Sequence, residues 1–128
     1  MSNLGNNPRR IACALCLDGV VFNDAITTIT STSFRCVPFH DFAILIKLVV
    51  AGTPTDILFD IEFSEDNVTF YKLMNGPFGD LRYEDAAGNK NEAVFGKIAG
   101  KYVRVTATAT GTAAQDTFTA SVYVLIGK

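Results

Sequence analysis

Two neighbouring segments, residues 41–50 and 57–63, place an apolar side chain at every second position. The apolar set of the first is Phe42, Ile44, Ile46, Leu48 and Val50, and that of the second is Ile57, Phe59, Ile61 and Phe63. In the second segment, the opposite side carries Asp60, Glu62 and Ser64. Successive side chains of an extended strand point to opposite faces, so both segments are predicted strands with one face in an apolar core.

Further alternating or β-branched segments extend the same pattern along the chain. The additional predicted strands are residues 9–17, 20–22, 25–30, 68–74, 81–84, 93–98, 101–110 and 117–126. Residues 65–67 are predicted as a tight connector, which makes 57–74 a hairpin. No segment shows a capped helical stripe, so we expect little or no helix. The predicted fold is all-β: a two-sheet antiparallel β-sandwich, jelly-roll-like, with an extended N-terminal arm.

Length and composition limit the possible classes of protein. A chain of 128 residues has room for one core, and we expect one β-sandwich domain over 11–128 after a polar arm over 1–10. A formal net charge of −2 with scattered basic residues argues against nucleic-acid binding. No apolar run reaches the length of a membrane helix. The apolar run 11–17 ends at Asp18 without a cleavage site, so we expect synthesis in a cytoplasm.

Three cysteines and the single histidine form the most metal-like pattern. Cys13 and Cys16 are followed by Cys36 and His40, a ligand set that suits structural zinc. Positions i and i+3 of a strand point to opposite faces, and no glycine lies between the first two cysteines to let the chain turn. Free cysteines are also common small core residues. The zinc site and buried thiols therefore both remain open, and an odd number of thiols favours a reducing compartment.

Acidic and nucleophilic residues give no convincing catalytic arrangement. Asp60 and Glu62 share a strand face at about 7 Å, which lies within the spacing of glycosidase pairs. The same spacing occurs on any solvated strand face, or in an ion pair with Lys47 or Arg104. His40 precedes an aspartate, but the sequence has no nucleophile elbow and no phosphate-binding loop. We expect a protein that is not an enzyme and that has no cofactor.

Three fragments together resemble the discoidin-like, galactose-binding-like jelly rolls. The fragment F-D-I-E-F-S-E-D-N-V-T-F-Y-K-L at 59–73 is similar to their strand–turn–strand hairpin. G-K-Y-V-R-V-T-A-T at 100–108 is similar to their R-Y-V-R strand, with Lys101 in place of the first arginine. F-T-A-S-V-Y-V-L-I-G at 118–127 resembles the closing strand. The likeness runs from about residue 39 to the end of the sequence.

Two groups share this hairpin: secreted lectin-like domains and small virion proteins of tailed bacteriophages. The sequence departs from the lectins, because Phe70 replaces their tryptophan after the turn and no disulfide pair brackets the domain. The resemblance therefore implies a non-enzymatic virion protein, foremost a capsid decoration (cement) protein on the outer surface of the capsid. Its expected partners are the major capsid protein and copies of itself, as a trimer. Expected contact residues in the arm are Asn6, Asn7, Arg9 and Arg10.

The alternative that remains open is a carbohydrate-binding or adaptor module of a phage tail or receptor-binding apparatus. Aromatic and amide side chains gathered at one end of the sandwich would favour it. The candidate pairs are Phe78 with Asn75, and Asn89 with Asn91.

Overall fold

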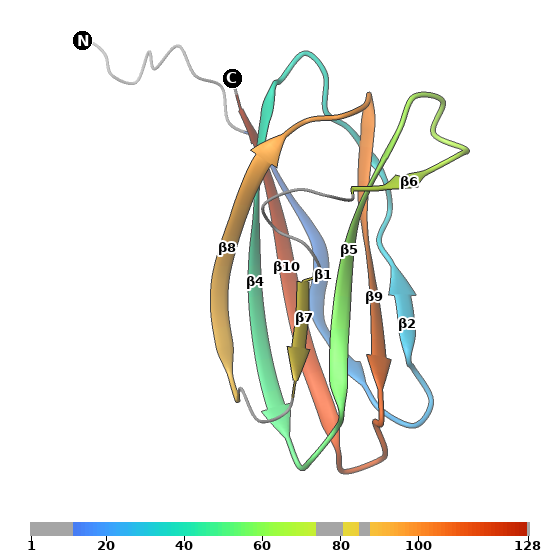
Figure 1. The fold of residues 1–128 in the computed structure, drawn as a ribbon, viewed down its shortest axis with the longest axis vertical. Coiled ribbons are helices and arrows are strands. Elements are labelled where there is room, and N and C mark those ends of the chain that lie inside the picture. Colours follow the sequence, from blue (N-terminus) through green and yellow to red (C-terminus); the bar gives the residue numbers. More distant parts are fainter. Residues whose placement is uncertain (1–11, 74–80, 85–87, 128) are drawn as a thin grey trace, which may run out of the picture.

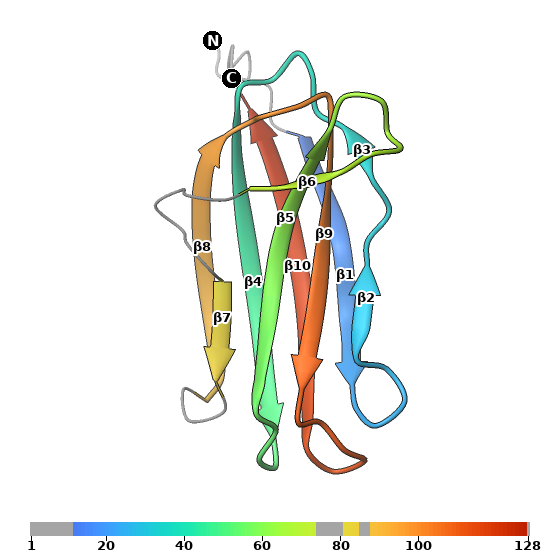
Figure 2. The same ribbon diagram turned by 45° about the vertical axis from the view of Figure 1, so that its right-hand side comes forward.

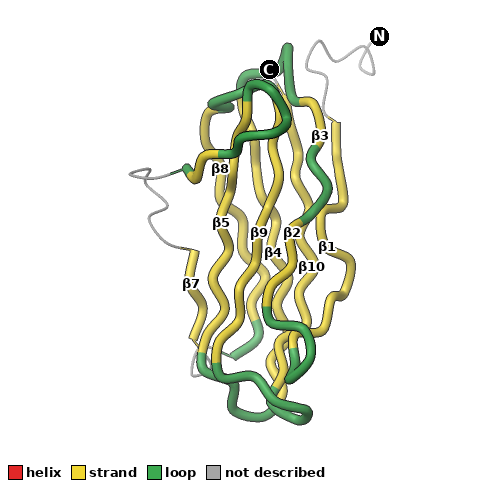
Figure 3. The backbone as a smooth tube through the Cα atoms, turned by 90° about the vertical axis from the view of Figure 1, so that its right-hand side faces the viewer, coloured by secondary structure: helices red, strands yellow, loops and turns green. Residues whose placement is uncertain are grey.

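The computed structural model describes residues 12–73, 81–84 and 88–127, with side chains described from Cys16 onward and not for 81–84. The strands are β1 (Ala12–Phe22), β2 (Thr28–Thr30), β3 (Phe34–Arg35), β4 (Asp41–Ala51), β5 (Asp56–Ser64), β6 (Tyr71–Lys72), β7 (Leu81–Glu84), β8 (Lys90–Lys97), β9 (Tyr102–Thr110) and β10 (Thr117–Gly127). The described residues contain no helix (Figure 3). Among them, therefore, no helix is long and apolar enough to span a membrane.

Two antiparallel sheets form the two layers of the molecule (Figure 1). Sheet A has the order β1-β10-β4-β8, and sheet B has the order β2-β9-β5-β6, with β3 also on β9 and β7 also on β5. The pairs are nested: β1 with β10, β2 and β3 with β9, β4 with β8, and β5 with β6 and β7. This winding of outer pairs around inner pairs is a jelly roll, which confirms the predicted fold class.

The core lies between the sheets and uses the predicted alternating positions. Its buried side chains come chiefly from β4, β5, β9 and β10, which run along the same axis in Figure 2. The rings of Phe42 and Phe63 belong to opposite sheets, and their centroids lie 5.7 Å apart. Burial of such apolar area is the main favourable term in folding, at about 25 cal/mol per Å².

The first strand is longer than predicted, because Asp18 and Gly19 do not end it. β1 continues past them to Phe22, and its pairing with β10 shifts register between Leu17 and Val20. Gly19 has φ +58°, and its N–H donates to Ser121 Oγ at 2.9 Å. A bulge absorbs the turn-forming residues without breaking the strand.

The second half of the predicted hairpin is mostly a loop. Only β6 remains of the predicted strand 68–74, and residues 65–70 form the connection. Asp66 Oδ1 accepts hydrogen bonds from the amides of Val68 and Thr69, both at 2.9 Å, and Ser64 Oγ accepts one from the amide of Asn67 at 2.8 Å. Short polar side chains thus accept hydrogen bonds from the backbone amides that a second strand would need for pairing with its neighbour.

These hydrogen bonds lead to a testable prediction about the pKa of Asp66. The amides of Thr69 and Val68, followed by the Ser64 hydroxyl, lower the pKa of Asp66 below its ordinary value of 3.8. The contribution of the loop contacts to stability is therefore fully present above pH 3.8 and is lost as the pH falls through the lower, folded value. In an NMR titration, we expect the carboxyl and the two amides to shift together below pH 3.8. The urea-unfolded chain is the control, and a folded midpoint at or above 3.8 would contradict the assignment.

Candidate interaction surface

The outer face of sheet A is apolar. The register places its outward side chains in cross-strand rows: Val21, Thr119 and Val49; Tyr123, Leu45 and Ala93; Leu125, Ala43 and Phe95. One polar row of Ser121, Lys47 and Asn91 lies among them. Of the eight large apolar side chains that the structure describes as exposed, five lie on this face, so the exposure is concentrated and not scattered. We call this surface, defined by Val21, Leu45, Val49, Phe95 and Tyr123, the apolar face.

The outer face of sheet B is polar by contrast. Its rows consist mainly of threonines and charged groups: Thr28, Thr108 and Leu58; Thr30, Thr106 and Asp60; Arg104, Glu62 and Lys72. Concentrated exposed apolar surface is characteristic of a contact site.

The two carboxylates considered as a catalytic pair belong to this polar face. Arg104 Nε contacts Glu62 Oε1 at 2.6 Å, and its guanidinium lies 3.8 Å from the centre of the Phe70 ring. Asp60 pairs with Lys72 at 3.5 Å. The predicted Arg104 partner is therefore correct, whereas Lys47 is wrong because β4 belongs to the other sheet. Glu62 is buried and not solvated, and both carboxylates have cationic partners that suit a structural role.

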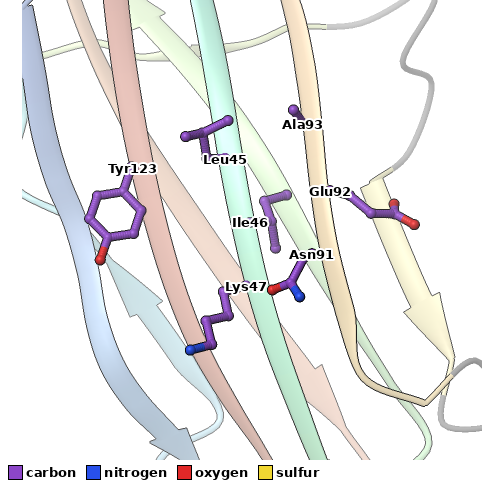
Figure 4. A pocket seen from close by; sticks show the side chains of 7 residues that line it. All are labelled: Leu45, Ile46, Lys47, Asn91, Glu92, Ala93 and Tyr123. Carbon is purple, nitrogen blue, oxygen red and sulfur yellow. The ribbon is translucent and has the colours of Figure 1, made fainter.

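An open hollow of about 330 Å³ lies within the apolar face (Figure 4). It is lined by Leu45, Ile46, Lys47, Asn91, Glu92, Ala93 and Tyr123. The side chains of Tyr123, Leu45 and Ala93 come from three adjacent strands at one level of the sheet. Phe95 stands two residues along β8 from Ala93, outside the hollow, with 76% of its surface exposed. A depression and a protruding aromatic ring thus share one face.

The structure does not gather the candidate zinc ligands that it describes into a metal-binding cluster. Cys36 is fully buried in the core, and its thiol donates to the carbonyl of Gly100 at 3.2 Å. Cys16 is half-buried and packs against the core, while the side chain of Cys13 lies outside the described part. No cluster of three metal-ligating side chains occurs among the described residues. For Cys36 the observed role is that of a small core residue.

Burial makes the Cys36 thiol unreactive in the folded protein. Desolvation is the largest influence and raises its pKa from 9.0 to about 11, and the thiolate is the reactive form. In a Cys13→Ser, Cys16→Ser variant at pH 8, we expect labelling of Cys36 by a thiol reagent to be at least about 100-fold slower than after unfolding in urea. A matched variant carries its only thiol at exposed Thr32, as Thr32→Cys with all three native cysteines replaced. Equal labelling rates in the two folded variants would contradict the assignment.

Several predicted contact residues lie outside the described part. This applies to the arm residues Asn6, Asn7, Arg9 and Arg10, and also to Asn75 and Phe78 of the glycan alternative. Of the other glycan pair, Asn89 Oδ1 accepts the amide hydrogen of Val50 at 2.9 Å, which holds this residue, next to the start of β8, against β4. Asn91 lines the hollow. The apolar face itself was not predicted from the sequence.

No protein-family model and no curated protein matches the chain. Among solved structures, it is similar to a chain of infectious bursal disease virus, Gx strain, with a TM-score of 0.50 and 10% identity, covering 95% of this chain and 32% of that one. The VP2 subviral particle of the same virus gives a TM-score of 0.52 and 12% identity, with coverages of 94% and 33%. Dimeric latent PorU from Porphyromonas gingivalis gives a TM-score of 0.50 and 7% identity, with coverages of 94% and 13%.

These likenesses concern the fold. The present chain spans about a third of the length of the viral chains and a smaller share of PorU. At such identities one jelly-roll scaffold hosts unrelated functions, so function has to be argued from the surface.

Proposed function

We propose that this chain is a non-enzymatic structural protein of a virus particle, which acts by packing its sandwich against neighbouring subunits. The observation that carries the proposal is the apolar face, because exposed apolar side chains gather on one sheet while the other sheet is polar. The jelly-roll fold shared with chains of virus particles supports it.

In its finer form, the proposal is a capsid decoration protein of a tailed phage. The hairpin and strand motifs that resemble small phage virion proteins support this assignment. The protein would bind the outside of the capsid, with the major capsid protein and copies of itself as partners, at a threefold or quasi-threefold site. Many modest contacts acting together give firm attachment without any single strong one.

The N-terminal arm, residues 1–10, would supply further contacts to the capsid. Arg9 and Arg10 would contact acidic coat surface, with Asn6 and Asn7 beside them. Replacing both arginines with alanine should weaken binding to the particle and reduce its dependence on salt. Lys101→Ala, which removes an exposed charge far along the chain, is the control.

The test is to add purified chain to phage heads that lack it and to image the particles. Saturation at a fixed copy number on the capsid surface would support decoration, together with greater resistance of the heads to heat. Binding to tails alone would exclude decoration but keep a structural role. Absence of binding to heads, tails and coat protein would overturn the structural role itself.

A carbohydrate-binding module remains the second candidate, because the ring of Tyr123 shares the hollow with Asn91 and Lys47 (Figure 4). Aromatic rings and amides are the groups that hold sugars. Retention on immobilised glycans that is lost in a Tyr123→Ala variant would favour it over decoration. The mostly apolar surroundings of the hollow favour a protein contact instead.

A further inference from the structure

We propose that the apolar face pairs with the same face of a second copy of this chain, with Phe95 of each copy filling the hollow beside Tyr123 of the other. This pairing rests on the proposed function in one respect, since it names the occupant of the surface through which the sandwich assembles. It makes the unit in solution a twofold pair, in place of the trimer expected from the resemblance. Three properties of the face support it: its extent, its shape and the placement of its charges.

The extent of the face suits a stable pair. Sheet A has four strands, and β4 has 11 residues. With strands about 4.8 Å apart and about 3.4 Å per residue, the face measures about 19 by 37 Å, or about 700 Å². A specific protein interface buries about 800 Å² on each partner, so this one face is nearly sufficient. The register of β10 with β4 is unbroken over all 11 pairs, so these two central strands present a continuous surface.

The shape of the face is self-complementary. In a twofold pair, the same patch of both copies must fit itself, so a protrusion and its receptor have to lie on one face. Phe95 and the hollow meet this condition, because Phe95 is two residues from Ala93 on the same face of β8, about 7 Å away. A heterologous contact, as in a ring of three, would place the two features on different surfaces. A buried aromatic ring is a typical energetic centre of such a contact.

The charges at the face can stay in contact with water when two copies pair, although Lys47 lines the hollow itself. Asp41 and Lys97 neutralise each other at 2.7 Å at one end of the face. Figure 4 shows Glu92 turned away from Tyr123, toward the edge of the sheet. Lys47 is exposed, and its long stem lets the ammonium group reach the rim while its methylenes pack inside. Neither charge therefore has to be buried without a partner.

The experiment measures the mass of the isolated chain by sedimentation over a range of concentrations. We expect a two-copy species in the wild-type chain, at least tenfold weaker association in Phe95→Ser, and a similar loss in Ala93→Leu, which obstructs the hollow but keeps Phe95. Tyr71→Ser removes another exposed aromatic ring, outside the face, and should leave the mass unchanged. Thermal unfolding of each variant at low concentration verifies that the fold is retained.

The outcomes separate this pairing from the proposed function. A wild-type chain that stays monomeric, forms trimers, or associates through Tyr71 overturns the pairing, whether or not it binds phage heads. Pairing as expected with no binding to any particle component supports the pairing and overturns the virion role. Pairing that persists in both Phe95→Ser and Ala93→Leu shows that another surface is used and overturns the pairing as well.

Discussion

Replacing Phe118 with alanine is expected to lower the free energy of unfolding by about 4 kcal/mol. Phe118 is fully buried, and it lies in register with Phe22 of β1 on one side and Val50 of β4 on the other. Because β10 is hydrogen-bonded along both edges, its backbone cannot move inward to fill the cavity. The total stability of such a chain is about 5–15 kcal/mol, so the loss is a large part of it.

The measurement is urea unfolding followed by far-UV circular dichroism, since the chain has no tryptophan to report by fluorescence. Phe95→Ala is the matched control, because it makes the same chemical change on a side chain that is 76% exposed. At concentrations where the chain is monomeric, the control should cost less than about 0.5 kcal/mol. Similar losses at the two positions would contradict the assignment of Phe118 to the core.

The core could be predicted because alternation identifies a half-buried strand without knowledge of its partner. In 41–50 and 57–63 the predicted inward residues lie in the core, from Phe42 in β4 to Phe63 in β5, and of these only Val50 is partly buried. The order of the strands within each sheet could not be predicted in this way. Pairing of β1 with β10 joins the two ends of the chain, and period-2 alternation contains no information about such distant partners.

Local chemistry explains the misplaced strand ends. The β-branched and aromatic residues of 68–74 favour a strand, but the side chains of Ser64 and Asp66 bind the backbone amides that follow them. At Gly19 the opposite occurred, because tertiary pairing with β10 outweighs a local turn signal. A propensity is therefore reliable only where no nearby side chain and no distant strand competes for the same donors.

The apolar face has a signal in the sequence of β4. In 57–63 the outward positions include two acids, whereas in 41–50 the outward positions Ala43, Leu45 and Val49 are apolar as well. A strand that is apolar on both sides indicates that both of its faces are covered. The contribution of Phe95 could not be predicted, because its neighbour in β4 depends on the register of β8.

The Arg104–Glu62 ion pair was one of two pairings predicted for the acidic residues, the other being with Lys47. Only the assignment of strands to sheets decides between them.

Replacing Gly111 with alanine is expected to cost about 3 kcal/mol of stability or more. Gly111 has φ +71° in the loop after β9, and an ordinary residue pays about 1–2 kcal/mol for that left-handed conformation. A Cβ there would also overlap Thr55 Oγ1 and lie 2.7 Å from Thr55 Cβ and 2.9 Å from its backbone nitrogen. Because the amide of Thr55 donates to Thr110 O at 3.0 Å, moving apart would weaken the pairing of β5 with β9.

A Gly19→Ala variant separates the cost of the left-handed backbone conformation from the cost of the steric overlap. Gly19 has φ +58°, but a Cβ built on it meets no atom within 4 Å. Only the backbone conformation should therefore lower the free energy of unfolding of this variant, by about 1 kcal/mol. Urea unfolding of both variants then gives the steric share as the difference, about 2 kcal/mol. Thr55→Gly removes both side-chain atoms that obstruct position 111, so combining it with Gly111→Ala should recover part of the loss, as a double-mutant cycle measures. Equal losses at Gly19 and Gly111 would mean that the backbone conformation, and not the contact between the two loops, makes glycine necessary there.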